Sequence, residues 1–343
     1  MQEKYENMLK DITVSFSPHI SRQYPTRSIM MDVIIALAPA MIAAMYFFRL
    51  HAIALVVTCV LSCAAAELIC NMIRGKANTL DDLSAVVTGI ILAFSLPPAF
   101  PIWAAIVGSA FAITLGKVVF GGLGANIFNP AMAGRAFLTA CFGMLMTTWT
   151  VPAPIQAEMP VISADNTVDT RTQATPLAHS KDVQKAHYGA LALDRRIANI
   201  FFGNVGGCLG ETSALALIIG GIYLLIRKTI TYHIPAGVLV AAAIFSATAY
   251  LVNSDTYASP LYHLSSGGLL LGAFFIATDP VTAPLTRRGM LLFGFGVGTI
   301  TMLVRIVGEY PEGVMYSVLL MNAVAPLIDR LFKRIPLGGK PRA

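Results

Sequence analysis

Long apolar segments alternate with short polar ones along almost the whole chain. A transmembrane helix needs about 20 mostly apolar residues, whereas the strands of a porin-type barrel alternate in polarity over about ten. The pattern therefore predicts an all-α polytopic membrane protein with about ten transmembrane helices. The predicted segments are 31–48, 52–73, 82–96, 102–120, 129–147, 211–226, 235–252, 264–278, 289–305 and 313–332.

The segments fall into two blocks of five, which divide the chain into five regions. A cytoplasmic N-terminal segment, 1–30, precedes a first membrane repeat, 31–147. We expect the polar interval 148–210 to form an outward-facing loop. A second membrane repeat, 211–332, and a basic cytoplasmic tail, 333–343, complete the chain. The N-terminal segment lacks the apolar core of a cleaved signal peptide.

The two blocks resemble each other in sequence. Each has a short apolar run that ends at proline, a glycine-rich span, and an Asn close to a Pro near the last span. Because five spans is an odd number, the second copy must be inverted in the membrane relative to the first. Inverted repeats with interrupted helices are a recurring plan of transporters. The matching phrases are VVTGIILAFSLPPAFP with ANIFNPAMAGRAF, and LLLGAFFIATDPVTAP with MYSVLLMNAVAPLID.

The third and eighth segments are too short to cross a bilayer as simple helices. About 14 apolar residues rise roughly 21 Å as a helix, less than the ~30 Å hydrocarbon core. Each segment is cut by proline, at Pro97 and Pro280. Ordinary short spans with snorkelling ends are one interpretation. The matched positions in the two blocks favour broken half-helices around a central site, where released backbone groups face protein or a cavity.

Composition and charge agree with a membrane protein and suggest its orientation. Hydrophobic residues make up 56% of the chain and charged residues 12%, whereas soluble domains carry roughly 25% charged residues. The net charge of +6 does not indicate a nucleic-acid partner, because excess Lys and Arg in membrane proteins usually mark cytoplasmic loops. If the N-terminus is cytoplasmic, all five basic clusters lie inside, both termini are cytoplasmic, and the interval 148–210 faces out.

The cysteines do not predict a metal site. Neither CxxC nor a Cys/His cluster occurs, and isolated Cys residues in apolar stretches usually behave as small hydrophobic residues. The sequence also lacks a GxGxxG after a strand and the cysteine spacing of iron–sulfur clusters. We therefore assign no metal ligand and no catalytic residue. The five cysteines are Cys59, Cys63, Cys70, Cys141 and Cys208.

The polar interval carries a threonine-rich phrase, VDTRTQATPLAHS. Its Asp-x-x-Thr-x-Ala-Thr pattern resembles the target motif of the flavin transferase that links FMN to threonine through a phosphoester. A small residue beside the acceptor leaves room for the bulky FAD donor, and Pro176 biases the residue before it away from helix. We predict Thr175 as the acceptor, in an extended and accessible segment. The other motif residues are Asp169, Thr172 and Ala174.

Two further observations bear on this prediction. A second Ala-Thr pair ends at Thr278, but Phe275 and Gly272 stand where the motif has a hydroxyl and an acid. The phrase departs from the motif at Gln173, where a smaller residue is expected. A solvated Thr-rich loop without chemistry is the alternative interpretation of 168–180.

Longer phrases extend this resemblance over nearly the whole chain. SFSPHI, GGLGANIFNPAMAGRAF, GCLGETSALALIIGGIYLLI and GAFFIATDPVTAP are similar to the D-subunit family of the Rnf complex. That family shares ancestry with the B subunit of the sodium-pumping NADH:quinone oxidoreductase. The resemblance implies a bacterial or archaeal cytoplasmic-membrane complex that moves electrons between reduced ferredoxin and NAD⁺ and couples this to Na⁺ or H⁺ transport.

The resemblance also implies cofactors and partners. The subunit would carry covalent FMN at Thr175 on the outer side, with a second, non-covalent flavin, riboflavin, within its helices. Its partners would be the other membrane subunits, peripheral iron–sulfur and flavin subunits, the bilayer, and a flavin transferase for maturation. It would be part of an ion-translocating oxidoreductase and not catalytic alone.

Three other functions stay open from the sequence. The B subunit of the sodium-pumping quinone reductase would depend on quinone rather than ferredoxin. A solute channel similar to urea transporters shares the repeat plan but predicts no bound flavin. A purely structural membrane scaffold is disfavoured by the acceptor phrase.

Five polar residues in or beside the spans are candidates for an ion path or a second-flavin site. Glu211 either caps the sixth span or binds a cation or flavin. Asp279 either caps a turn or lines an inner cation entrance. Asn126, Asn129 and Asn322 lie at matching repeat sites beside prolines. Their amides either satisfy broken backbone or offer carbonyl oxygens to Na⁺.

Other charged residues in the spans are expected to have structural roles. Asp32 lies near the start of the first segment, where we expect an interfacial acid in reach of water. Glu67, Lys117, Arg135 and Arg305 lie deeper or near segment ends. Because charges are costly in hydrocarbon, we expect these side chains to snorkel or to pair internally.

Overall fold

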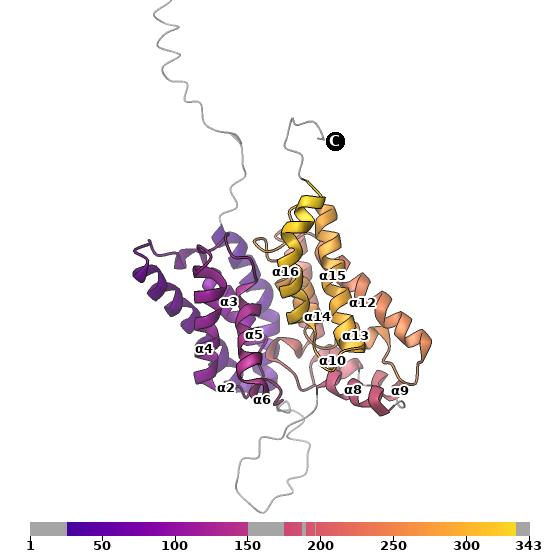
Figure 1. The fold of residues 1–343 in the computed structure, drawn as a ribbon. Coiled ribbons are helices and arrows are strands. Elements are labelled where there is room, and N and C mark those ends of the chain that lie inside the picture. Colours follow the sequence, from indigo (N-terminus) through magenta and orange to yellow (C-terminus); the bar gives the residue numbers. More distant parts are fainter. Residues whose placement is uncertain (1–25, 150–174, 187–189, 196, 334–343) are drawn as a thin grey trace, which may run out of the picture.

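The computed structural model describes residues 26–149, 175–186, 190–195 and 197–333. Within these residues all regular elements are helical, which confirms the predicted all-α class. Each predicted apolar segment coincides with one helix or with a run of adjoining short helices. Figure 1 shows the two blocks as two bundles side by side.

The first bundle begins with a hairpin. α2 (Thr26–Ile73) consists of two helical arms that meet at Arg49, where the backbone leaves helical geometry. Ile29 near its start lines the same cavity as Lys117, which bonds Glu67 near its end, so the arms run antiparallel. The bundle continues with η1 (Leu80–Asp82), α3 (Ser84–Phe94), α4 (Ile102–Ile113), the π-helical turn η2 (Thr114–Val118), α5 (Pro130–Cys141) and α6 (Gly143–Met146).

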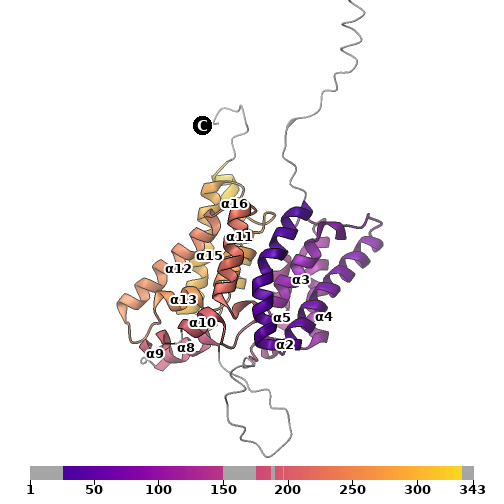
Figure 2. The ribbon, with the colours of Figure 1, turned by 180° about the vertical axis from the view of Figure 1, so that it is seen from behind.

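The second bundle repeats this order with different lengths. In this bundle α12 (His233–Val252) packs against α15 (Arg287–Ile306), as α2 packs against α4 in the first bundle. Figure 2 shows α11 beside α2, where the two bundles meet. The elements are α11 (Ala214–Arg227), α12 (His233–Val252), α13 (Pro260–Ser265), α14 (Leu269–Leu271), the π-helical turn η4 (Gly272–Ile276), α15 (Arg287–Ile306) and α16 (Val314–Leu331).

The interval between the bundles is not simply a loop, which corrects the expectation for 148–210. Its described part contains α8 (Pro176–Ala186), α9 (Leu191–Asp194), α10 (Ile197–Phe202) and η3 (Leu209–Glu211). α8 is held by side chains that bond the end of α15: Lys181 donates to the Gly308 carbonyl and Gln184 to the Ile306 carbonyl. Free carbonyls at a helix C-terminus are natural partners for polar side chains, so a polar sequence forms helices here.

Two short helical elements pass through the centre of the molecule. α3 has 11 residues, and α14 with η4 runs from Leu269 to Ile276; both are buried along nearly their whole length. Protein groups bond the carbonyls at their C-terminal ends. The Leu209 N–H donates to Leu96 O at 3.1 Å, and Asn129 Nδ2 donates to Ile276 O at 3.4 Å. The predicted short third and eighth segments are therefore present. The end of α3 is bonded by η3 of the interval, and the end of η4 is bonded by Asn129 of the first bundle.

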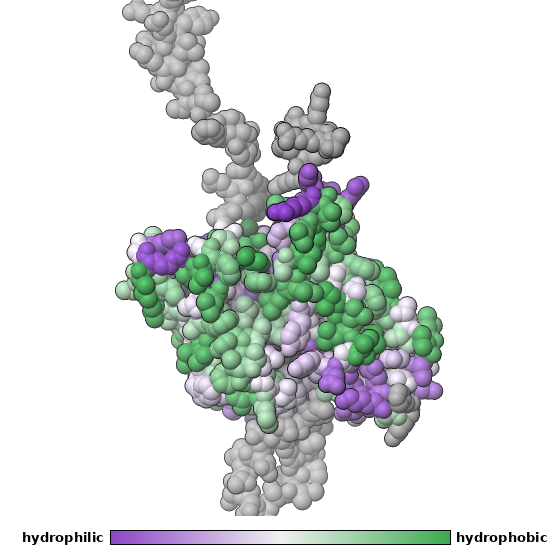
Figure 3. All heavy atoms as spheres, in the orientation of Figure 1, coloured by the Kyte–Doolittle hydropathy of each residue, from purple (hydrophilic) through white to green (hydrophobic). Residues whose placement is uncertain are grey.

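The surface and the helix lengths agree with a membrane protein. In the described part, α2, α12, α15 and α16 are long and apolar enough to cross a bilayer, and α3, α4 with η2, and α11 are shorter apolar helices. Figure 3 shows an apolar band across the middle of one face, with polar side chains at its upper and lower margins. Large exposed apolar side chains include Ile42, Tyr46, Ile106, Ile244, Leu303 and Leu320.

The contact between the bundles depends on a glycine. A Cβ atom on Gly220 would lie 2.1 Å from the Ala36 carbonyl oxygen, a distance that only movement of the α2 or α11 backbone can relieve. Small residues allow such close helix approach in membranes. We expect Gly220→Ala to lower the free energy of unfolding by roughly 1–3 kcal/mol through overpacking.

Chemical unfolding in detergent micelles, followed by intrinsic fluorescence, measures this loss. Gly143→Ala is the matched control, because a Cβ there meets no atom within 4 Å. Equal stability of the two variants would contradict the assigned α2–α11 contact.

Candidate functional site

Two cavities lie along the interface between the bundles. The Thr175 cavity, of about 820 Å³, is lined by Arg135, Thr175, Glu211, Gly267 and Glu312 among others. The Asp279 cavity, of about 720 Å³, is lined by residues that include Ser84, Lys117, Asn129, Phe275 and Asp279. The start of α5 lines the second cavity and its middle lines the first, so the cavities lie at different levels along that helix.

Thr175 is the N-cap of α8. Its Oγ1 accepts a hydrogen bond from the Ala178 N–H at 3.0 Å, and its carbonyl accepts one from the His179 N–H at 2.9 Å. The side chain lines the cavity and the residue is only 7% exposed. This corrects the expectation of an extended, accessible segment. Pro176 keeps Thr175 itself non-helical but opens a helix, because proline is favoured in the first turn.

The remaining acceptor-motif residues cannot be placed beside Thr175. Asp169, Thr172 and Ala174 lie outside the described residues. The competing Thr278 lies on the wall of the Asp279 cavity, where its Oγ1 donates to the Phe274 carbonyl at 2.7 Å. The two Ala-Thr pairs therefore belong to different cavities.

An incompletely bonded ion pair forms part of the wall of the Thr175 cavity. Arg135 Nη2 lies 3.8 Å from Glu211 Oε1 and 3.7 Å from the Cys208 sulfur. Both charged side chains are buried, and Glu211 Oε1 accepts no hydrogen bond from the described residues. The helix-capping alternative for Glu211 is wrong, because Ser213 is the N-cap of α11 and accepts from the Ala216 N–H at 3.3 Å.

A second ion pair beside this cavity has more hydrogen bonds, although Arg305 Nε has no partner among the described residues. Arg305 Nη1 donates to the His263 carbonyl at 2.7 Å, and Nη2 donates to the Ser266 carbonyl at 3.1 Å and to Glu312 Oε1 at 3.3 Å. Glu312 Oε2 accepts from the Gly268 N–H at 3.0 Å. The pair ties the end of α15 to the turn that precedes α14.

The pKa of Glu312 reflects these partners. Burial alone would raise the pKa of the carboxyl group. The Arg305 and Arg135 guanidiniums and the N–H groups of Gly268 and Val314 outweigh burial, so the pKa lies below its ordinary value of 4.5. Glu312 could not be identified as a site residue from the sequence. An acidic residue in a loop is usually exposed, and only the tertiary fold brings Glu312 to Arg305.

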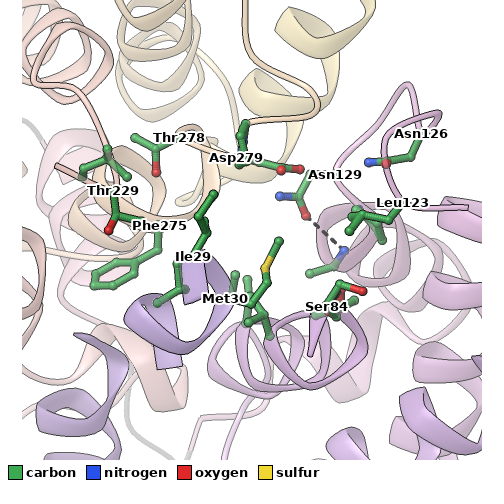
Figure 4. Close-up of a pocket in the computed structure, with 18 of the residues that line it drawn as sticks. Ile29, Met30, Ser84, Leu123, Asn126, Asn129, Thr229, Phe275, Thr278 and Asp279 are labelled. Carbon is green, nitrogen blue, oxygen red and sulfur yellow. Dashed lines mark hydrogen bonds between the residues drawn. The ribbon is translucent and has the colours of Figure 1, made fainter. Parts of the chain in front are cut away.

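Asp279 caps a turn, as one of the two expectations had it, and it lines the other cavity. Its Oδ1 accepts from the Val281 N–H at 3.2 Å and its Oδ2 from the Thr282 hydroxyl at 3.3 Å, so it caps the turn after η4. It also lines the cavity, and Figure 4 shows the Asp279 and Asn129 side chains pointing toward one another.

The asparagines bond backbone at the junction of the bundles. Asn129 Oδ1 accepts from the N–H groups of Ala131 and Met132, which caps α5, while its amide reaches Ile276 O. With the Asn322 amide oriented to satisfy its neighbours, its oxygen accepts from the Asn129 N–H at 3.0 Å.

Asn126 differs from the other two asparagines. It donates to the Phe128 carbonyl at 3.2 Å, and its Oδ1 has no hydrogen-bond partner among the described residues. Asn129 and Asn322 thus satisfy interrupted backbone, as one of the two expectations had it, and Asn126 does so only within its own turn.

Internal pairing is confirmed for the deeply placed charges. Lys117 Nζ lies 2.7 Å from Glu67 Oε1 and 2.6 Å from the Ser84 hydroxyl, at the edge of the Asp279 cavity. Asp32 is 8% exposed and accepts from the Thr229 hydroxyl at 2.8 Å and from Arg227. The expectation that Asp32 reaches water is therefore wrong, because α11 of the second bundle covers it.

The described residues contain no group of three or more His, Cys, Asp or Glu side chains suited to hold a metal ion. All five cysteines are free, and Cys59, Cys63 and Cys208 are buried. Cys59 and Cys63 pack in the hydrophobic core.

Comparisons with known proteins find relatives over nearly the whole length. The profile of the NQR2, RnfD, RnfE family matches residues 13–338. The D subunit of the Na⁺-translocating ferredoxin:NAD⁺ oxidoreductase complex of Acetobacterium woodii is 46% identical over 325 residues, 94% of each chain. The corresponding subunit of the proton-translocating ferredoxin:NAD⁺ oxidoreductase complex of Clostridium ljungdahlii is 38% identical over 335 residues, 95% of this chain and 96% of that one.

The Arg305–Glu312 pair gives a pH-dependent prediction. Because the pKa of Glu312 is lowered on folding, its contribution to stability is fully present above pH 4.5 and is lost as the pH falls through the folded-state value. We expect Glu312→Gln to cost about 3 kcal/mol near pH 7, since it breaks a buried pair. The gap in unfolding free energy from the wild type should narrow below pH 4.5.

Denaturant unfolding at a series of pH values tests this expectation. Glu309→Gln, at an exposed acid in the same loop, is the control and should leave the free energy of unfolding nearly unchanged. A gap between Glu312→Gln and the wild type that stays constant with pH would contradict the assigned role.

Proposed function

The chain belongs to the NQR2, RnfD, RnfE family, and we propose that it is the D subunit of an ion-translocating ferredoxin:NAD⁺ oxidoreductase, the Rnf complex. Both relatives named above are D subunits of such complexes. Each aligns with this chain over more than nine-tenths of its own length. The subunit carries electrons within the complex and is not catalytic alone.

We propose that Thr175 carries covalent FMN. The single observation that supports this most is that the hydroxyl named by the acceptor phrase lines a cavity between the bundles. The same cavity wall contains Glu211 Oε1, which is buried without a hydrogen-bond partner among the described residues. The flavin supplies electron-transfer chemistry, while the protein supplies position and electrostatics.

α8 fits the phosphoester end of that cofactor. The helix has 11 residues and begins directly after Thr175. The N–H groups at a helix N-terminus favour bound phosphate. Because Thr175 is buried in the folded chain, the segment around it must be open while the transferase acts and close around the phosphoester afterwards.

The proposed architecture is two inverted five-helix repeats. Support comes from the two half-helices: α3 begins at Ser84 on the Asp279 cavity, whereas α14 begins just after Gly267 on the Thr175 cavity. The two elements therefore run in opposite directions. In Figure 1, α2 begins and α16 ends at the upper end of the molecule, and α8 lies at the lower end.

We place the protein in a bacterial or archaeal cytoplasmic membrane, with the described start of α2 and the end of α16 toward the cytoplasm. Arg227 and Arg330 lie at the ends of α11 and α16, as the positive-inside rule favours for cytoplasmic ends. The Thr175 cavity then faces out. Its partners are the other membrane and peripheral subunits of the complex, and the flavin transferase during maturation.

The Asp279 cavity is the proposed inner site. It offers Asp279, Asn126 and Asn129 to an ion or to a non-covalent flavin such as riboflavin, with Asn322 bonded to Asn129 behind them. Glu211 faces the Thr175 cavity at the other level. We propose that Na⁺ or H⁺ movement is coupled to flavin charge along this line of residues.

Two other functions give distinguishable outcomes. A B subunit of the sodium-pumping quinone reductase would pass electrons to quinone without ferredoxin. A urea-transporter-like channel would bind no flavin and would conduct solute through the cavities.

Peptide mass spectrometry tests the covalent flavin. In protein made with its flavin transferase, we expect an FMN-sized mass increment on the peptide that contains Thr175, fluorescent under ultraviolet light. Thr175→Val should lose the increment completely, since no hydroxyl remains, while Thr278→Val should keep it. An unmodified Thr175 peptide, with the transferase active on another substrate, would sink the covalent-flavin proposal and favour the solute channel.

Cavity filling tests the second flavin. Acid extraction of the purified protein should release riboflavin in equimolar amount. Thr88→Phe, which places a ring in the Asp279 cavity, should lower the released flavin about tenfold, since loss of about 1.4 kcal/mol in affinity has that effect. The covalent FMN should remain.

Thr248→Phe, on the exposed face of α12, is the control for the aromatic substitution. Equal release of riboflavin from the wild type, Thr88→Phe and Thr248→Phe would move the second flavin away from the Asp279 cavity.

A further inference from the structure

Two buried arginines beside the Thr175 cavity differ in how well they are bonded. The Arg305 guanidinium donates to two carbonyls and to Glu312. Among the described residues, the Arg135 guanidinium donates to the Cys208 sulfur, at 3.7 Å. A guanidinium carries five N–H donors. Arg135 therefore holds donor capacity on the cavity wall that the described part of the protein does not use.

Glu211 complements this unused capacity. Its Oε1 lies 3.8 Å from Arg135 Nη2, too far for a hydrogen bond, and is buried without a partner among the described residues. An unsatisfied buried charge costs more than a neutral group. Two adjacent groups of opposite polarity, both short of partners and both facing one cavity, indicate a ligand that presents an acceptor next to a donor.

The charge balance narrows the class of ligand. The charged side chains on the wall are Arg135, Glu211 and Glu312, and Arg305 pairs with Glu312 from behind it. The four formal charges sum to zero, so this group as a whole favours neither anions nor cations. A phosphate or carboxylate offers acceptors without a donor and would meet Glu211. A neutral imide edge, with a carbonyl beside an N–H, matches both groups. The pyrimidine end of an isoalloxazine ring is such an edge.

We infer that Arg135 and Glu211 bind the pyrimidine edge of the flavin on Thr175, with Arg135 donating to the ring C2 carbonyl and Glu211 accepting from the ring N3–H. This rests on the proposed covalent FMN at the same cavity. Arg135 then stabilises negative charge that reduction places near that carbonyl, and Glu211 opposes it. Arg135 therefore raises the reduction potential of the flavin, and Glu211 lowers it.

The full chain, made with its transferase, allows a direct test by spectroelectrochemistry of the covalent FMN. The signal of any non-covalent flavin is subtracted with a Thr175→Val sample. We expect Arg135→Met to lower the potential and Glu211→Gln to raise it. Each shift should reach at least tenfold in the one-electron equilibrium, about 59 mV.

A vibrational readout separates ring contact from a general charge effect. The infrared band of the ring C2 carbonyl should move to higher frequency in Arg135→Lys, which keeps the charge but loses the planar fork. If Arg135→Met does not fold, the carbonyl band of Arg135→Lys tests the contact between Arg135 and the ring. Thr248→Val, a neutral change on the exposed face of α12, should leave both the potential and the band unchanged.

The outcomes distinguish this inference from the function on which it rests. FMN present on Thr175, with potentials and carbonyl band unchanged in the Arg135 and Glu211 variants, would overturn the inference and leave the proposed function standing. Absence of FMN from Thr175 in the wild type would overturn both.

Discussion

The fold depends on satisfying backbone carbonyls where two helices stop inside the molecule. α3 and the α14–η4 element end at prolines, and in an apolar surrounding each freed carbonyl costs several kcal/mol, on the order expected for an unpaired polar group. The partners come from outside each helix's own bundle: the Leu209 N–H of η3, in the interval, bonds the end of α3, and the Asn129 amide of the first bundle bonds the end of η4. Neither bundle can therefore complete its centre alone.

Buried charged side chains also pair within the fold, and the two cavities differ in how completely those charges are paired. Beside the Thr175 cavity, the Arg305–Glu312 pair makes several hydrogen bonds, whereas Glu211 Oε1 of the Arg135–Glu211 pair has no hydrogen-bond partner among the described residues. The Asp279 cavity instead pairs Lys117 tightly with Glu67 and leaves Asp279 and Asn126 at its wall. Such a division suits a flavin held at one level and an ion or second flavin at the other.

Much of this could be predicted from the sequence. Hydropathy located all ten helical segments, and the prolines marked the two short ones. The asparagine–proline phrases indicated the junction where Asn129 and Asn322 meet. The helices within 148–210 could not be predicted, because α8 is polar and is held by tertiary bonds to the end of α15. The same reason applies to Glu312, and to the burial of Thr175 as a cap. The residues that hold α8 and bury Thr175 are distant in sequence, and Arg305 meets Glu312 only through the fold of the α15–α16 turn.

The central claim is that electrons pass through a flavin on Thr175 in the assembled complex. Its most direct test is the rate of NAD⁺ reduction by reduced ferredoxin in membranes whose complex carries Thr175→Val, measured together with ion uptake. The account predicts that both rates fall to background while the complex stays assembled. Wild-type rates of electron transfer and ion uptake in that variant would contradict it.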